Sequence, residues 1–152
     1  MNILLSPIGT VRNSRRVVED DGWGGIVSVI ELDSSFTEEA LLGIEQFSHA
    51  EIFFYFHLVE DAKIETGARH PRNNQAWAKV GIFAQRGKNR PNRLGATIVK
   101  VIERRGSHLL VQGLDAVDGT PVLDIKPVMQ EFLPQECVTQ PQWAAELMRN
   151  YW

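Results

Sequence analysis

The sequence predicts a mainly β protein: a single closed or nearly closed β-barrel with short helices and a C-terminal tail helix. Its 152 residues fit one domain that is large enough to bury a core. Six or seven short runs rich in β-branched and aromatic residues follow one another, with little helical periodicity between them. Strands without intervening helices argue against a doubly wound parallel sheet, and a barrel is the all-β architecture that suits this length.

The predicted strands are short. They cover residues 3–12, 26–32, 52–57, 80–84, 94–103, 108–114 and 121–125. Pro7 and Gly9 indicate a bend in the first strand, which is typical of an edge position. Residues 104–107 have the composition of a hairpin turn between two of the later strands.

Helix is predicted at only two places. Residues 37–42 follow capping residues and end at Gly43, so they predict one short helix. A closing helix is predicted over residues 142–150, directly after a proline. Residues 60–77 have little periodicity and are predicted to form a long loop, and loops of this length are often functional.

Composition limits the classes of function. The formal net charge is −3, so the chain has no overall basic field for nucleic acid, and such binding would need a local patch. The single cysteine, Cys137, excludes an internal disulfide and a cysteine-rich zinc site. The first residues lack the pattern of a secretory signal, and no apolar run approaches the roughly 18 residues of a membrane span, so we expect a cytoplasmic protein. Residues 1–140 are expected to form the barrel domain, and residues 141–152 a tail rather than a second domain.

The loop over residues 86–95 is the first of two segments that suit a polar ligand. Pro91 fixes its own φ angle and restricts Arg90, so side chains of this loop are held in set directions. Arginine forks and asparagine amides bind anions and nucleotides, which makes Arg86 and Asn92 candidates for recognition. The alternative is a basic turn that only faces solvent.

The second segment, residues 113–127, places Asp115, Asp118 and Asp124 around a tight turn. Carboxylates and backbone amides there suit ribose hydroxyls or an amino group. Alternatively, the Asp118-Gly119 pair is only what the turn requires, and Asp124 forms an ion pair nearby. Aspartates also bind hard cations, but the neighbouring arginines would compete, so no metal is expected.

Among the four histidines, His57 at the end of an apolar strand and His70 in the long loop are the better site candidates. No HxxxH or HxH spacing is present, which disfavours a zinc site. The sequence also lacks a GxGxxG motif after a strand, a P-loop and a GxSxG elbow. Rossmann-type methyltransferases and dehydrogenases, P-loop NTPases and α/β-hydrolases are therefore disfavoured.

Four motifs in order connect the chain to a known family. They are residues 8–12 (IGTVR), residues 43–49 (GIEQFSH) running on to 56–57, residues 81–86 (GIFAQR) with 90–92 (RPN) and 95, and residues 114–115 with 118–127 (DGTPVLDIKP). Together they resemble the TrmO/TsaA-like family, also called YaeB-like or VirR-like, of S-adenosylmethionine-binding β-barrels. Two positions depart from the family pattern: Glu51 stands where a Trp is usual, and Arg93 replaces the second proline of an RPNP loop.

The resemblance implies S-adenosyl-L-methionine as cofactor, bound without a Rossmann fold near the interface of a homodimer. The family's reaction is tRNA adenine-N6 methylation, on N6-threonylcarbamoyl-adenosine next to the anticodon. Matched position by position, the implied cofactor contacts are Gly22, Trp23, Gly24, His57, Leu58, Arg86, Ala96, Asp115, Ala116, Val117 and Asp118.

Methyl transfer depends mainly on positioning, and a carbamoylated N6–H is acidic enough for a modest base. His70 and Asp124 are the candidates for that base, and Asn92 or Arg86 is the candidate for orienting the base or the carboxylate of the modified nucleoside. The expected tRNA contacts form a local basic patch of Arg86, Lys88, Arg90 and Arg93.

Two other interpretations stay open. The barrel can be a non-catalytic module that binds S-adenosylmethionine and acts through a partner. It can also methylate a different small substrate, because the family's bacterial enzymes carry an additional C-terminal domain that helps to hold tRNA, and here a short tail follows the barrel.

Overall fold

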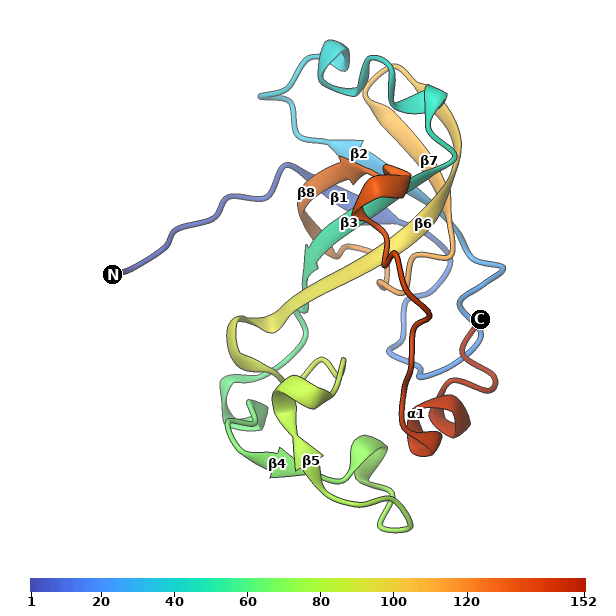
Figure 1. Cartoon of the computed structure of the whole chain (residues 1–152). Coiled ribbons are helices and arrows are strands. Elements are labelled where there is room, and N and C mark those ends of the chain that lie inside the picture. The colour runs from blue at the N-terminus through green and yellow to red at the C-terminus, as the bar shows by residue number, and fades with distance from the viewer.

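The computed structural model describes residues 1–152 and shows a closed antiparallel barrel. Its strands are β1 (Gly9–Arg12), β2 (Val27–Leu32), β3 (His49–Tyr55), β6 (Leu94–Arg105), β7 (His108–Gln112) and β8 (Pro121–Pro127). Around the barrel they follow the order β1-β2-β7-β6-β3-β8, and pairing of β1 with β8 closes it (Figure 1). The predicted fold class is confirmed.

Alternate residues of each strand fill the barrel. In β3, Ala50, Ile52 and Phe54 point inward and are buried, while the residues between them are partly exposed. The same alternation places Val99 of β6 and Val111 of β7 in the same core. Removing these apolar side chains from water is the main favourable contribution to folding.

Two short 3-10 turns cover one end of the barrel. Figure 1 shows η1 (Glu38–Leu41) and η2 (Ile44–Gln46) at the top, in cyan. Gly43 joins them with a φ of 89°, a left-handed conformation that favours glycine. Leu41 and Ile44 point down into the barrel core. The helix predicted for this segment is therefore a 3-10 turn that closes the barrel.

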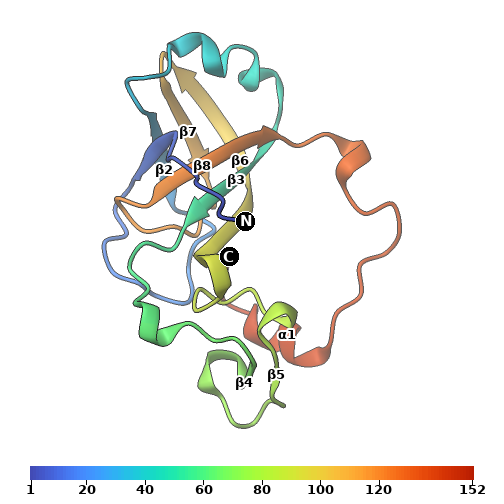
Figure 2. The same ribbon diagram turned by 90° about the vertical axis from the view of Figure 1, so that its left-hand side faces the viewer.

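A lobe of residues 56–93 extends from the other end of the barrel, in green and yellow-green in Figure 2. It contains a two-stranded sheet, β4 (Ala68–Arg69) with β5 (Val80–Gly81). Four 3-10 turns complete it: η3 (Asp61–Lys63), η4 (Pro71–Asn73), η5 (Ile82–Ala84) and η6 (Pro91–Arg93). The strand predicted for residues 80–84 is thus only two residues long, and it pairs within the lobe instead of joining the barrel.

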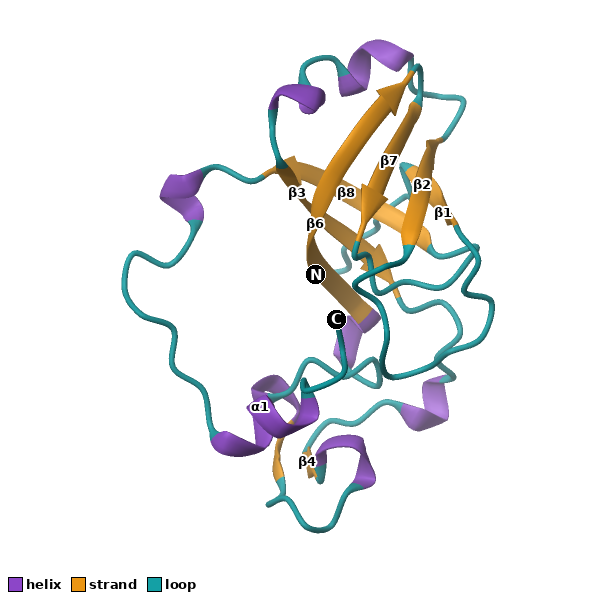
Figure 3. Ribbon diagram, turned by 90° about the vertical axis from the view of Figure 1, so that its right-hand side faces the viewer, coloured by secondary structure: helices purple, strands orange, loops and turns teal.

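After β8 the chain leaves the barrel in a wide excursion through η7 (Gln130–Phe132), which Figures 2 and 3 show clearly. It returns in α1 (Gln142–Leu147), which lies beside the lobe, where Trp77 Nε1 donates a hydrogen bond to Glu146 Oε2 at 2.7 Å. The helix is shorter than predicted, and the last residues turn back towards the barrel. No helix of the chain has the length and apolar character that crossing a membrane requires.

Two strands begin three or more residues away from the predicted start, and several other strand boundaries differ by one or two residues. The first strand is limited to β1, because Pro7 cannot donate to a ladder and residues 3–5 are exposed. β3 begins at His49, earlier than predicted, because His49 and Ala50 already pair with β6, and Ala50 also pairs with β8.

Candidate functional site

The site lies where β6 loses one of its two neighbours. β7 ends at Gln112, which is opposite Lys100, so residues 94–99 of β6 have a strand neighbour only on the β3 side. Groups along an unpaired strand edge are free to bind something other than a strand. The segment after β7, the arginine loop and the last residues of the chain all meet this edge.

Asp115 is the centre of the site. It follows Leu114, which is fully buried in the barrel core and so fixes the backbone in front of the carboxylate. The carboxylate accepts one hydrogen bond from the Thr97 hydroxyl of β6 and a second from the Tyr151 hydroxyl. The geometry shows that this half-buried carboxylate accepts hydroxyl donors from two sides.

Arg86 reaches the same stretch of β6 from the arginine loop. Its Nη2 donates a hydrogen bond to the carbonyl oxygen of Ala96, the residue before Thr97. Arg86 and Asp115 therefore bind neighbouring residues of one strand. The structure brings the arginine loop and the aspartate turn together at this edge.

The loop with Gly22 and Trp23 lines another side of the site. The N–H group of Gly22 donates to the carbonyl oxygen of Asn150 at 3.1 Å, and that of Trp23 donates to the carbonyl oxygen of Tyr151 at 2.8 Å. The Trp23 side chain is buried and lies under the guanidinium group of Arg15, 4.3 Å from the ring centroid. The anchored indole thus holds two backbone donors towards the site.

The tail packs closely over this loop. At Gly24 a Cβ atom would lie 2.7 Å from the carbonyl carbon of Trp152, so a larger residue would displace the tail. The Tyr151 ring lies below the guanidinium group of Arg72, 6.0 Å away. Arg72 is held in turn by Asp21, whose Oδ1 accepts from its Nη2 at 2.8 Å.

Burial raises the pKa of the Tyr151 hydroxyl far above its usual range, and the charge and hydrogen bond of Asp115 raise it further. Arg72 and Arg86 act in the opposite direction and lower the pKa, because their positive charges favour the ionised hydroxyl. The hydroxyl therefore remains protonated and acts as a donor to Asp115 at any physiological pH.

The other predicted residues of the aspartate turn have a structural part. Asp118 Oδ1 accepts the N–H of Asn13 at 3.1 Å, and the Asn13 side chain donates to the carbonyl oxygen of Ala116 at 2.8 Å. The Val117 carbonyl oxygen accepts from the Thr120 hydroxyl at 2.7 Å. In residues 115–118, only Asp115 has its side chain in the cluster with Tyr151.

The histidine candidates lie apart from Asp115. His57 and Leu58 follow β3 at its lobe end, and the His57 side chain makes no hydrogen bond. His70 Nδ1 bonds to the carbonyl oxygen of Trp77 at 2.6 Å. Because a carbonyl only accepts, Nδ1 is the donor in this contact, so in the neutral ring the lone pair lies on Nε2. His70 lies two residues before Arg72, whose guanidinium group lies over the Tyr151 ring.

Asn92 and Asp124 are not part of the cluster either. Asn92 is exposed with a φ of 63°, and its side chain has no partner. Asp124 Oδ2 pairs with Lys126 Nζ at 2.9 Å. It lines a separate apolar groove of about 540 Å³ between β8 and the η1–η2 cap, and none of the predicted cofactor residues lines this groove.

The basic patch is partly used within the chain. Arg90 Nη1 donates to the carbonyl oxygen of Gln85 at 2.7 Å, and Arg93 Nη1 donates to the Tyr55 hydroxyl at 2.5 Å. Arg93 also pairs with Asp61. Lys88 is exposed and has no ion-pair partner, so it is the freest cation of the four.

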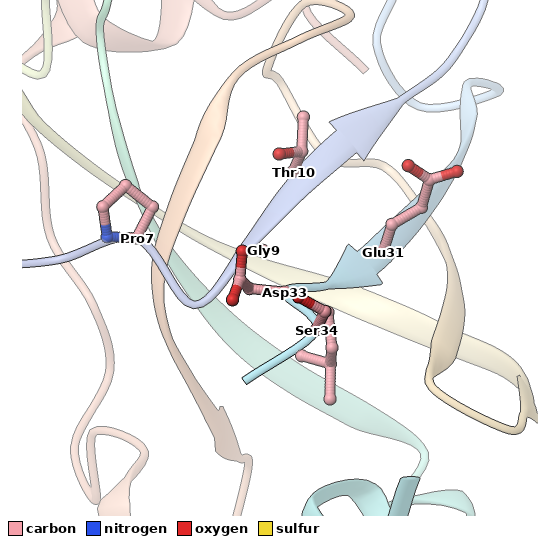
Figure 4. Close-up of a pocket in the computed structure, with 7 residues that line it drawn as sticks. Pro7, Gly9, Thr10, Glu31, Asp33 and Ser34 are labelled. Atoms are coloured by element: carbon pink, nitrogen blue, oxygen red, sulfur yellow. The ribbon is translucent and has the colours of Figure 1, made fainter. Parts of the chain in front are cut away.

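A second hollow lies on another face of the barrel. Figure 4 shows this shallow polar pocket of about 240 Å³ between β1 and the end of β2, with the carboxylates of Glu31 and Asp33 at its rim. It contains no predicted site residue, and Glu31 is paired with Arg12 at 3.0 Å.

Sequence reasoning misses three residues of the cluster: Thr97, Arg72 and Tyr151. Thr97 has a signal, since it is the inward-facing neighbour of Ala96 on a strand with period two. Arg72 lies in the loop that was predicted to be functional. Tyr151 has no signal, because nothing in the tail sequence indicates that the tail returns to the barrel.

Comparisons with known proteins agree with this fold. The model of the tRNA-methyltransferase O N-terminal domain matches residues 20–132. A human tRNA (adenine(37)-N6)-methyltransferase is 38% identical over 113 residues, which are 74% of this chain and 25% of that protein. A probable S-adenosyl-L-methionine-binding protein of Pyrococcus abyssi is 38% identical over 141 residues, 90% of this chain and 73% of that protein. A crystal structure of TrmO from Pseudomonas aeruginosa has a TM-score of 0.72 at 29% identity, covering 90% of this chain and 61% of the other.

The barrel is thus the fold that the solved TrmO structures share. The chain belongs to the tRNA-methyltransferase O N-terminal domain family, since the family model covers most of its length. It spans only about a quarter of the human relative and about half of the Escherichia coli tRNA (adenine(37)-N6)-methyltransferase, of which 47% is matched.

Proposed function

We propose that this protein is an S-adenosyl-L-methionine-dependent methyltransferase that acts on N6 of an adenine in tRNA. The main observation behind this proposal is that Asp115, Arg86 and the Gly22–Trp23 N–H groups come together near the open edge of β6. Membership of the family, and the activity of the full-length relatives, support the same assignment. The finer substrate we propose is N6-threonylcarbamoyl-adenosine next to the anticodon.

The groups at the site fit the cofactor. S-adenosyl-L-methionine has ribose hydroxyls that donate hydrogen bonds and a carboxylate that accepts them. Asp115 accepts hydroxyl donors, and the N–H groups of Gly22 and Trp23 donate to oxygen atoms. Arg86 places a guanidinium group beside them. The donor and acceptor pattern of the site is thus complementary to that of the cofactor.

When bound, the cofactor supplies an electrophilic methyl group on a sulfonium sulfur. The protein's own part is to hold the acceptor nitrogen in line, exclude water and accept one proton from N6. We propose His70 as the base, because its Nδ1–H is bound to the Trp77 carbonyl oxygen, which leaves Nε2 to take a proton, and because it adjoins Pro71-Arg72. Asn92 is proposed to orient the nucleoside from its exposed position on the arginine loop.

The experiment uses cofactor carrying a labelled methyl group with tRNA that has or lacks the threonylcarbamoyl group. We expect label in the modified tRNA, and a fall of about tenfold or more in kcat for His70→Gln. Asp124→Asn separates the two predicted bases: it should keep its rate, since Asp124 lies in the apolar groove. Loss of activity in Asp124→Asn with full activity in His70→Gln would exchange the two roles.

Cofactor binding is tested separately by calorimetry. Asp115→Ala or Arg86→Ala should weaken binding by about 1–3 kcal/mol, the cost of leaving a buried polar partner unsatisfied. Arg105→Ala is the matched control, because Arg105 is exposed and pairs with Glu103 on the far hairpin. Unchanged affinity in both site variants would remove this site.

A second candidate function is a non-catalytic module that binds S-adenosyl-L-methionine. It is favoured by one observation, the tail that covers Asp115, because a covered site suits a sensor whose tail moves. The Pyrococcus relative, described as a probable binding protein, is matched over most of its length. Cofactor binding without label in either tRNA would favour this function.

We further propose that the protein is a homodimer in the cytoplasm, where its tRNA substrate is found. The apolar groove between β8 and the cap supports a dimer, since its rim carries the exposed side chains of Phe36 and Leu42. Light scattering coupled to size-exclusion chromatography measures the mass directly. A single species at the 17.2 kDa of one chain would contradict the dimer.

A further inference from the structure

We propose that the segment Asn150–Trp152 is a built-in competitor for the cofactor site and must leave Asp115 and the Gly22–Trp23 N–H groups before a ligand can bind there. This inference rests on the proposed cofactor site. It adds one conformational step to ligand binding, the release of the tail from its contacts.

The tail satisfies the same groups that would hold the cofactor. The backbone carbonyl oxygens of Asn150 and Tyr151 accept hydrogen bonds from the N–H groups of Gly22 and Trp23. The Tyr151 hydroxyl donates a hydrogen bond to one oxygen of the Asp115 carboxylate. An N–H group has a single hydrogen to donate, so tail and ligand cannot both have these bonds. The Tyr151 hydroxyl occupies the acceptor that a ribose hydroxyl of the cofactor would use. The two tail carbonyls occupy the donors that the cofactor's carboxylate would use.

The docked tail is held by packing as well as by hydrogen bonds. The Tyr151 ring is partly buried and lies under the Arg72 guanidinium group, which Asp21 fixes in place. Trp152 lies against Gly24 and against the edge of the Tyr151 ring, at a centroid distance of 4.9 Å. The tail is therefore seated in a formed site rather than lying loosely on a surface.

The chain before the tail allows it to leave without opening the barrel. Residues 134–140 are exposed and donate no backbone hydrogen bond to the barrel or the lobe. The barrel ladder closes between β1 and β8 and does not include the tail. Release of the tail costs only its own contacts, so the binding of a ligand can drive it.

Competition fixes the sign of the mutational effect. If only a fraction of molecules has the tail released, the apparent dissociation constant is the intrinsic constant divided by that fraction. Tyr151→Phe removes the hydrogen bond to a charged carboxylate, so the released fraction rises and the cofactor should bind about tenfold more tightly. A chain ending at Arg149 should bind at least as tightly. A tail that instead formed a wall of the filled site would give weaker binding in both variants.

The experiment measures two quantities on the same set of proteins. Calorimetry with S-adenosyl-L-methionine compares wild type, Tyr151→Phe and the chain ending at Arg149. Tyr55→Phe is the matched control: it removes the only other tyrosine hydroxyl, which accepts from Arg93 away from the tail, and should leave affinity unchanged. Amide hydrogen exchange without ligand follows the N–H groups of Gly22 and Trp23, which should be protected in wild type and exchange faster in the shortened chain.

The outcomes separate this inference from the proposed function. Tighter binding in both tail variants supports the inference. Equal or weaker binding in them overturns it and leaves the cofactor site intact. Unprotected Gly22 and Trp23 amides in wild type overturn it whatever the affinity. If no protein binds the cofactor, the shortened chain included, both the proposed cofactor and the competition are overturned. Protected Gly22 and Trp23 amides would in that case show only that the tail docks at this place.

Discussion

The approach of β6 to Phe54 gives a prediction whose size can be worked from the structure. Gly95 pairs with Phe54 across the β3–β6 ladder. A Cβ atom at Gly95 would lie 2.4, 2.5 and 2.9 Å from three carbon atoms of the Phe54 ring. The ring is fully buried and packs edge-on against Phe56 at 5.3 Å, so it has no room to withdraw. Gly95→Ala therefore overpacks the core, at a cost of about 1–3 kcal/mol.

For a chain of this length such a loss lowers the melting temperature by about 2–12 °C. Thermal and urea unfolding followed by circular dichroism measure it. Gly87→Ala is the control: nothing lies within 4 Å of its Cβ position, so stability should be equal or up to about 1 kcal/mol higher. Because Gly95 precedes Ala96 and Thr97, the same variant should also weaken cofactor binding. A Gly95→Ala protein with the melting temperature of wild type would refute the tight packing of Gly95 against Phe54.

Four further predictions follow from named contacts. The pKa of Tyr151 is raised from 10.0, so the stability it contributes is complete below pH 10.0 and falls above it; urea unfolding at increasing pH should show this fall in wild type and not in Tyr151→Phe. The pKa of Glu45 is lowered from 4.5, by a backbone N–H and then by Arg104, so its contribution is complete above pH 4.5 and is lost as pH falls through the lowered value; Glu45→Gln should flatten the acid limb of the stability curve. Lys88→Ala should weaken tRNA binding and reduce the salt slope by about one, as loss of one phosphate contact would; an unchanged slope would take Lys88 out of the interface. Gly24→Ala should displace Trp152 and speed exchange of the Trp23 amide, and unaltered exchange would contradict the close approach of the tail.

The barrel was predictable because its signals are local. Apolar runs within residues 52–57 and 108–114 indicate strands, and the absence of helical periodicity between strands argues against the parallel alternatives. The strand ends were less predictable, since they depend on partners. His49 belongs to β3 only because β6 extends far enough to pair with it, and Val80 belongs to a strand only because Arg69 lies beside it.

The residues of the candidate site also differ in how far the sequence could predict them. Arg86 and Asp115 lie in segments whose glycine, proline and charged residues stand out in the sequence. Their meeting depends on where β7 stops, which no local pattern gives. Tyr151 could not be predicted, because its place follows from the path of an exposed excursion and not from its neighbours. Asp124 shows the opposite case: it stands in a strong motif, yet the strand turns it towards the apolar groove.

The position of the site has a physical reason in the closure of the barrel. A closed barrel uses its backbone N–H and C=O groups in ladders and leaves no edge for a ligand. Here β6 is longer than β7, so one end of β6 projects beyond its partner with the Ala96 carbonyl and the Thr97 hydroxyl available. Arg86, Asp115 and the tail all bind at this projection, because it offers unused polar groups beside a rigid core. A ligand that binds there has to replace contacts the protein already makes. The affinity of this site should therefore depend on Tyr151 as much as on the groups that touch the ligand.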